Sequence, residues 1–247
     1  MKVIIIAGGL GTRLSEETED KPKPMVLINN KPIIWHLMNI FSLQGFNEFI
    51  ISTGYKSEVI ENWVHDNEIV DSNSNLMKIA TLNTGLNTQT GGRIAEVMKT
   101  IPNEKIIATY GDGLANISIL KLLAFHDSHR KLATVTAVRP PARFGYMKID
   151  KNVVTHFGEK NQSDEGWING GFFVLEPKVA SYVKSLDEPF ESGALVRLAN
   201  ESELMANHHE GFWQPMDTLR EKKDLENLAL LKTPPWLDIQ DVATYFG

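Results

Sequence analysis

The segment Val3-Ile4-Ile5-Ile6-Ala7 is an unbroken aliphatic run, and Gly8-Gly9-Leu10-Gly11-Thr12-Arg13 follows it directly. A short run of this kind, bounded by polar residues, is typical of a strand covered on both faces, so we expect a central parallel strand here. An open α/β sheet presents its ligand crevice at the carboxyl ends of such strands. The sequence therefore predicts that residues 8–13 lie at a ligand site.

Downstream of this strand, the spacing of apolar residues alternates between helical and strand periods. Helices are predicted at 34–41, 59–64, 94–101 and 119–123, the last with Ser118 as its N-cap. Strands are predicted between them at 49–51, 77–82, 106–108 and 133–138. This alternation predicts a doubly wound α/β first half.

Beyond Pro140 the pattern changes to short strand-like segments, at 146–150, 153–158 and 168–175, and a last helix is expected over 218–231. Turn residues separate the short segments, which indicates a mixed or antiparallel second half. We therefore expect a single α/β domain over 1–247, with a mostly parallel central sheet and helices on both faces, divided into halves at 1–139 and 140–247.

Composition limits the class of protein. The chain has 247 residues, of which 42% are hydrophobic, enough for one complete core. Its apolar runs are far shorter than the ~20 residues of a membrane span, and the opening strand leaves no room for a cleavable leader, so we expect a cytoplasmic protein that begins at Met1. A formal net charge of -6 disfavours nucleic acid partners, and the absence of cysteine excludes disulfides and thiolate catalysis.

The glycine-rich segment has the composition of a phosphate-binding loop. Glycines let backbone N–H groups approach anionic oxygens closely, and Arg13 adds a permanent positive charge. Leu14 stands where a dinucleotide fingerprint needs its third glycine, and the Gly-Lys-Ser/Thr of a P-loop is absent. The remaining alternative is a plain glycine-rich turn.

Two lysines follow on a stiffened segment, Lys21-Pro22-Lys23-Pro24. Each proline fixes its own φ and restricts the residue before it, so the segment can aim a lysine at a phosphate. A solvated basic turn is the alternative reading.

Asp112 lies in the motif Tyr110-Gly111-Asp112-Gly113, at the carboxyl end of the strand expected near residue 108. A carboxylate beside a bound triphosphate requires a cation between them, and Mg²⁺ prefers one or two carboxylates together with phosphate oxygens. A second acidic residue is therefore expected from elsewhere in the chain. An aspartate that only forms a turn is the alternative.

Six motifs, in this order along the chain, resemble those of the sugar-1-phosphate nucleotidylyltransferases: GGLGTRLSEET (8–18), KPKPMV (21–26), TGGR (90–93), TYGDG (109–113), INGGFFV (168–174) and GFWQPMDTLR (211–220). The resemblance is strongest to the cytidylyl-transferring branch of that family. It implies a Rossmann-like nucleotidyltransferase fold, with a nucleotide-binding half at 1–139 and a sugar-phosphate-binding half at 140–247.

The resemblance also implies roles for individual residues. Asp112 and Asp217 match the metal ligands, and Lys160, Asn169 and Gly170 match positions that hold the sugar phosphate. Nucleotide contacts are implied for Ile6, Ala7, Gly8, Gly9, Leu10, Gly11, Thr12, Arg13, Lys23, Thr88, Arg93 and Gly111. Asn161 and the stretch 66–75 depart from the family pattern, but neither departure falls on a residue matched to phosphate or metal binding.

The implied reaction joins CTP to glucose 1-phosphate and yields CDP-glucose and pyrophosphate, by in-line attack without a covalent enzyme intermediate. Mg²⁺ is the implied cofactor, with Arg13, Lys23, Asp112 and Asp217 as the catalytic set. The resemblance further implies a homo-oligomer in nucleotide-sugar and O-antigen biosynthesis. The alternatives are a transferase that uses UTP, dTTP or another phosphorylated acceptor, and a non-catalytic nucleotide-sensing subunit.

Arg93 is a candidate for base recognition. Its guanidinium can only donate hydrogen bonds, so a contact at N3 or the adjacent carbonyl of the base would favour cytosine, whose N3 is an acceptor, over uracil, whose N3 carries a hydrogen. The alternatives for Arg93 are a phosphate contact and a cation at the start of a helix.

Overall fold

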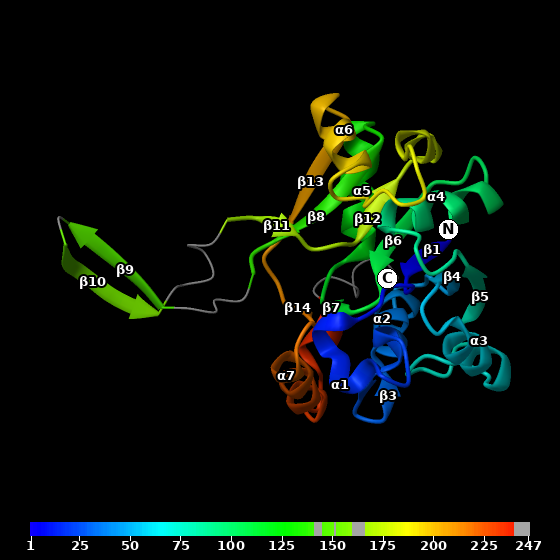
Figure 1. The fold of residues 1–247 in the computed structure, drawn as a ribbon, viewed down its shortest axis with the longest axis horizontal. Coiled ribbons are helices and arrows are strands. Elements are labelled where there is room, and N and C mark those ends of the chain that lie inside the picture. Colours follow the sequence, from blue (N-terminus) through cyan, green and yellow to red (C-terminus); the bar gives the residue numbers. More distant parts are fainter. Residues whose placement is uncertain (141–144, 151, 160–165, 240–247) are drawn as a thin grey trace, which may run out of the picture.

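The computed structural model describes residues 1–140, 145–150, 152–159 and 166–239. Its centre is a mixed sheet with helices on both faces (Figure 1). The strand order is β11-β8-β12-β6-β1-β4-β5, and β13 pairs with β8 beside this path. The strands are β1 (Val3–Ile6), β4 (Glu48–Thr53), β5 (Lys78–Asn83), β6 (Ile106–Tyr110), β8 (Ala133–Val138), β11 (Ile168–Asn169), β12 (Phe173–Leu175) and β13 (Leu204–His209).

The sheet has a parallel part and an antiparallel part. Strand β1 runs parallel to β4 and β6, and β4 runs parallel to β5, so the predicted central parallel strand is confirmed. Strand β12 is antiparallel to both β6 and β8. Because β12 comes from the second half of the sequence and lies between two strands of the first half, both halves contribute to one sheet.

Alternate residues of β1 face two separate hydrophobic clusters. Val3 and Ile5 pack in the cluster that contains α2 (Ile33–Ser42), whereas Ile4 and Ile6 pack in the cluster that contains α4 (Thr90–Thr100). The first cluster also receives apolar residues from α3 (Ser57–Asp66), α5 (Ile119–His129) and α7 (Leu219–Ala229), and the second from α6 (Ala194–Asn200). Both faces of β1 are therefore covered, as its unbroken aliphatic run predicts.

The segment expected as one strand over 168–175 is divided into β11 and β12, which corrects that prediction. Gly171 and Phe172 between them have positive φ angles of 77° and 49°. This left-handed backbone interrupts the extended conformation and turns the chain. The apolar pattern continues through the turn because Phe172 is itself buried, at 1% exposure.

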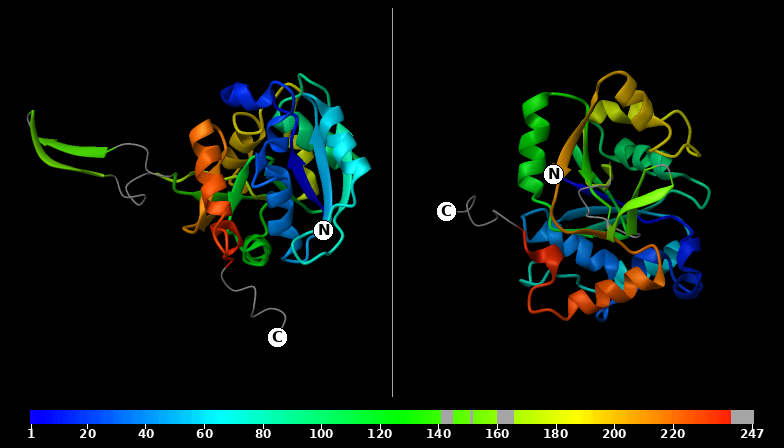
Figure 2. Two further views of the ribbon diagram at one scale, coloured as in Figure 1. Left: turned by 90° about the horizontal axis from the view of Figure 1, so that it is seen from below. Right: turned by 90° about the vertical axis from the view of Figure 1, so that its left-hand side faces the viewer.

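Smaller elements complete the fold. Short helices follow the first strand at η1 (Thr12–Leu14), α1 (Ser15–Thr18) and η2 (Lys23–Met25), and others lie at η4 (Pro177–Tyr182) and η5 (Pro235–Leu237). Three two-stranded ladders pair β2 (Leu27–Ile28) with β3 (Lys31–Pro32), β7 (Gly113–Ala115) with β14 (Trp213–Pro215), and β9 (Gly145–Asp150) with β10 (Val153–Glu159). Figures 1 and 2 show the β9–β10 hairpin extending away from the main sheet. Among the described residues, no helix has the length and apolarity needed to span a membrane.

Candidate active site

A cavity of about 600 Å³ opens at the carboxyl ends of β1 and β6, where the glycine-rich loop leaves the sheet. Its volume lies in the range typical of small-ligand sites. The predicted nucleotide contacts all line it: Ile6, Ala7, Gly8, Gly9, Leu10, Gly11, Thr12, Arg13, Lys23, Thr88, Arg93 and Gly111. The catalytic candidates Asp112 and Asp217 and the acceptor candidates Asn169 and Gly170 line it as well. The structure therefore gathers these residues in one pocket, while Lys160 lies outside the described residues.

The glycine loop depends on glycine at two positions. At Gly8, an added Cβ would lie 2.0 Å from Nη1 of Arg93, so the guanidinium packs directly against the loop. Gly11 has a φ of 65°, in the left-handed region that favours glycine. The loop therefore packs against the Arg93 guanidinium at Gly8 and turns at Gly11 towards Lys23.

The guanidinium of Arg93 is occupied by the protein itself. Nη1 donates to the Thr53 carbonyl (2.8 Å) and to Oγ1 of Thr84 (2.6 Å), and Nη2 donates to the Gly8 carbonyl (2.9 Å) and to the Leu86 carbonyl (3.4 Å). The residue is 2% exposed. Four of the five guanidinium N–H donors are used within the protein, which disfavours direct reading of the base edge by Arg93. The geometry makes it a support for the glycine loop.

We therefore expect Arg93→Leu to lower kcat/KM for CTP and UTP by similar factors and to lower the melting temperature. Each buried carbonyl that loses its partner costs about 1–3 kcal/mol. Parallel assays with both nucleotides and a thermal melt measure these effects. Arg197→Leu is the matched control, because Arg197 also donates to a backbone carbonyl, that of Tyr182, but does not line the pocket. A loss confined to CTP in the Arg93 variant would restore the base-reading role.

Two aspartates are brought together by the β7–β14 ladder. Asp112 immediately precedes β7, Asp217 lies two residues beyond β14, and Pro215 pairs with Gly113 in the antiparallel register. The Met216 N–H donates to the Asp112 carbonyl (2.8 Å), which extends this connection. The backbone of Asp217 is fixed in turn by Glu221, whose carboxylate accepts from the Asp217 N–H (2.8 Å) in the first turn of α7.

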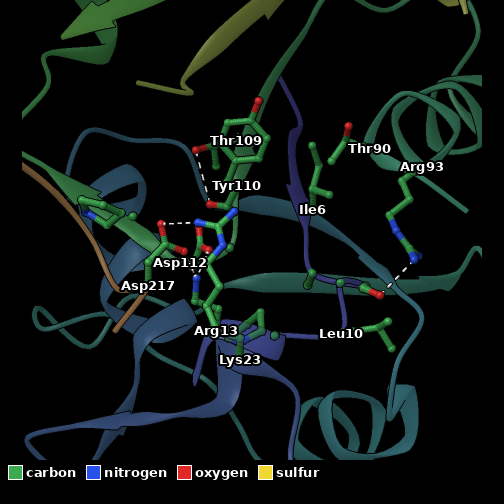
Figure 3. A pocket seen from close by; sticks show the side chains of 18 of the residues that line it. Ile6, Leu10, Arg13, Lys23, Thr90, Arg93, Thr109, Tyr110, Asp112 and Asp217 are labelled. Carbon is green, nitrogen blue, oxygen red and sulfur yellow. Dashed lines mark hydrogen bonds and ion pairs between the residues drawn. The ribbon is translucent and has the colours of Figure 1, made fainter. Parts of the chain in front are cut away.

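Lys23 lies between these two carboxylates. Its Nζ donates to Oδ2 of Asp112 and to Oδ1 of Asp217, at 2.6 Å in both cases, and Nη1 of Arg13 lies 2.9 Å from Oδ2 of Asp217 (Figure 3). Burial alone would lower the pKa of Lys23, but the charges of both aspartates and the hydrogen bonds to them outweigh it and raise that pKa. The lysine is thus held in its charged form.

Both carboxylates contact the same positive charge, which in this structure is the ammonium group of Lys23. Two carboxylates with open positions for phosphate oxygens are the ligand set that Mg²⁺ prefers, whereas a site closed by protein ligands alone would need more groups. No cluster of three or more acidic, histidine or cysteine ligands exists among the described residues. The site thus fits a divalent cation whose coordination is completed by a substrate.

Another part of the pocket lining is formed around β11. The Trp213 indole N–H donates to the Gly170 carbonyl (2.9 Å), and the Gly170 N–H donates to the Thr136 carbonyl (2.9 Å). An added Cβ at Gly170 would lie 2.5 Å from the Val138 side chain, so the backbone at Gly170 packs closely against β8. These contacts fix the backbone at Gly170, next to Asn169, in the lining of the pocket.

The structure adds pocket residues that the sequence did not single out for a role, among them Gln89, Thr90, Thr109, Tyr110 and Pro215. Burial and the neighbouring Glu191 carboxylate raise the pKa of the Tyr110 phenol, which therefore remains protonated at neutral pH. All of these added residues except Gln89 lie within the quoted motifs, which were the available signal for them.

Comparison with known proteins places these features in one family. A family model described as nucleotidyl transferase matches residues 2–246. A glucose-1-phosphate cytidylyltransferase of Salmonella typhi is 44% identical over 253 aligned positions, covering 96% of this chain and 98% of the relative. A probable glucose-1-phosphate cytidylyltransferase of Bacillus subtilis (strain 168) is 42% identical and covers 89% of this chain and 92% of the relative.

Among solved structures, HddC from Yersinia pseudotuberculosis complexed with GMP-PN matches with a TM-score of 0.70 and 27% identity, over 92% of this chain and 98% of that chain. The fold shared with that structure and the nearly full-length sequence matches are consistent with the observed pocket and its glycine loop. The chain belongs to the nucleotidyl transferase family.

Proposed function

We propose that this enzyme transfers the cytidylyl group of CTP to glucose 1-phosphate and releases CDP-glucose and pyrophosphate. The observation that carries the proposal is the convergence of Arg13, Lys23, Asp112 and Asp217 beside a glycine loop in one pocket. The choice of CTP and glucose 1-phosphate is supported by the relatives that bear those names over nearly the whole chain.

The geometry supports an electrostatic mechanism. The phosphate oxygen of the acceptor is already an anion at neutral pH, so the barrier comes mainly from bringing two polyanions together and stabilising the leaving group. Arg13 and Lys23 project into the pocket beside the glycine loop and supply positive charge for the pyrophosphate. Lys160 is proposed to hold the attacking phosphate. No general base is required, and no histidine lines the pocket among the described residues.

Asp112 and Asp217 are proposed to hold Mg²⁺, which when bound neutralises negative charge on the phosphates of the nucleotide. The protein's own part is to keep both carboxylates on one side of the pocket, through the β7–β14 ladder and the cap of α7. With a cation held there, the Lys23 ammonium would be available to bind phosphate oxygens.

A substrate panel tests the proposal. Pyrophosphate release is measured with CTP, UTP, dTTP and GTP, each with glucose 1-phosphate and with other sugar and polyol phosphates. We expect the largest kcat/KM for CTP with glucose 1-phosphate. A site that relies on polar complementarity to the base reaches selectivities of ~10⁴, because the wrong base leaves buried polar groups unpaired. Preference for another nucleotide or acceptor would contradict the substrate assignment, and the absence of turnover with every pair would favour a nucleotide-sensing protein.

The proposal extends to the cellular context: a cytoplasmic homo-oligomer that takes part in nucleotide-sugar biosynthesis for the O-antigen of lipopolysaccharide. Its support is the likeness to the cytidylyltransferases. Light scattering of the purified protein tests the oligomeric state.

A further inference from the structure

A chain of hydrogen-bonded side chains joins two walls of the pocket. The hydroxyl of Thr90, in the first turn of α4, donates to Oε2 of Glu191 (2.7 Å). The hydroxyl of Tyr110, at the end of β6, donates to Oε1 of the same carboxylate (2.5 Å), and the Asn169 amide donates to the Tyr110 oxygen (2.9 Å). Thr90, Tyr110 and Asn169 line the pocket, whereas Glu191 is not a lining residue.

Hydrogen bonds of neighbouring backbone groups hold the segment that carries Glu191. The Phe190 N–H donates to Oγ1 of Thr90 (2.8 Å), and the Gly91 N–H donates to the Glu188 carbonyl (3.1 Å). Phe190 itself is fully buried, in the cluster under α4. The carboxylate of Glu191 is therefore held at a fixed place beside Tyr110.

The donor and the acceptor of each hydrogen bond in this chain of side chains are determined. Tyr110 has a single hydroxyl hydrogen, which goes to Glu191, so its oxygen can only accept from Asn169. Oδ1 of Asn169 accepts from the Gly171 N–H (2.9 Å), which excludes the flipped orientation of the amide. One N–H of Asn169 then has no partner among the described residues and is left for a ligand.

We propose that Glu191 is a positioning residue for the acceptor, which acts through Tyr110 to orient the Asn169 amide towards a sugar hydroxyl. This inference rests on the proposed function. The negative charge of Glu191 disfavours a phosphate at this end of the pocket, and the positive charges of Arg13 and Lys23 lie around the two aspartates instead. The neutral amide suits an uncharged hydroxyl of the sugar ring.

Calorimetry with glucose 1-phosphate and with CTP, each titrated separately, tests the proposal in the full-length protein. We expect Tyr110→Phe to raise Kd and KM for glucose 1-phosphate roughly 10-fold, the effect of one lost hydrogen bond, with less than about a 3-fold change for CTP. Glu191→Ala should shift the same constants in the same direction. Glu191→Gln should stay near wild type, because its amide oxygen still accepts from Tyr110.

A double variant and a control separate positioning from folding. Adding Glu191→Ala to Tyr110→Phe should cause no further loss, because both changes break one chain. Tyr182→Phe is the control: Tyr182 also donates to a glutamate, Glu201, but does not line the pocket, and both substrates should bind as in wild type.

Three results would overturn the proposal: equal weakening of both substrates, additive losses in the double variant, or unchanged binding of glucose 1-phosphate in Tyr110→Phe. A monodeoxy analogue of glucose 1-phosphate that lacks the contacted hydroxyl should bind wild type and Tyr110→Phe equally. If wild type binds glucose 1-phosphate but forms no CDP-glucose, the proposed function fails, while the binding measurements still decide the role of Glu191.

Discussion

Asp112→Asn and Asp217→Asn are each expected to lower turnover by at least about 10³-fold, the upper range for the loss of one preorganised charge stabiliser. The two carboxylates lie at equal distances of 2.6 Å from one ammonium nitrogen, so they converge on a single cation position. Asparagine keeps the shape of either side chain but removes an anionic ligand. The remaining carboxylate alone would hold a divalent cation weakly.

Steady-state pyrophosphate release over a range of Mg²⁺ concentrations measures the loss. Binding of Mn²⁺ in the presence of CTP, followed by electron paramagnetic resonance, reports the metal site independently of turnover, and both variants should bind it more weakly. Asp127→Asn is the matched control, since Asp127 lies on α5 and pairs with Lys105 outside the pocket. Full activity of either site variant, or of wild type in excess chelator, would refute the metal assignment.

The central part of the fold could be predicted because its signals are local. The aliphatic run at β1 and the spacing that marks α2 and α4 depend on burial by neighbouring elements, which leaves a periodic pattern in the sequence. The break between β11 and β12 was missed although the Gly170-Gly171 pair is a turn signal. The second residue with a positive φ, Phe172, is a buried apolar residue that looks like part of a strand. Strand β13 includes Asn207, His208 and His209, so it lacks an apolar run, and its pairing with β8 is a tertiary contact.

The candidate site also has a part that the sequence predicts and a part that it does not. The glycine loop and Asp112 follow predicted strands directly, so their place at the sheet edge follows from the sequence. Asp217 could be assigned only through resemblance, because the β7–β14 ladder that brings it to Asp112 has no periodic signal. The sequence cannot show whether the donors of Arg93 serve a ligand or the protein, and it offers no motif for Glu191, whose contacts lie on two distant segments.

Lys23→Met is expected to lower turnover roughly 10²–10³-fold, because it removes a charge that we propose faces the triphosphate. The same change has a second effect that does not depend on turnover. Lys23 is 8% exposed and its single positive charge lies between both aspartates, so its loss increases the repulsion between them, which Arg13 at Asp217 offsets only in part, and lowers the melting temperature of the metal-free protein.

Divalent cations should reverse this loss of stability. In wild type a cation must displace the Lys23 ammonium from Asp112 and Asp217, whereas in Lys23→Met no ammonium group lies between these two carboxylates. Mn²⁺ without nucleotide should therefore bind the variant more tightly than wild type and raise its melting temperature further. Lys222→Met is the matched control, because Lys222 also bridges two carboxylates, those of Glu17 (2.7 Å) and Glu226 (3.4 Å), outside the pocket. If Mn²⁺ stabilises Lys23→Met no more than it stabilises wild type, the ammonium group and the metal do not compete for the same position between the aspartates.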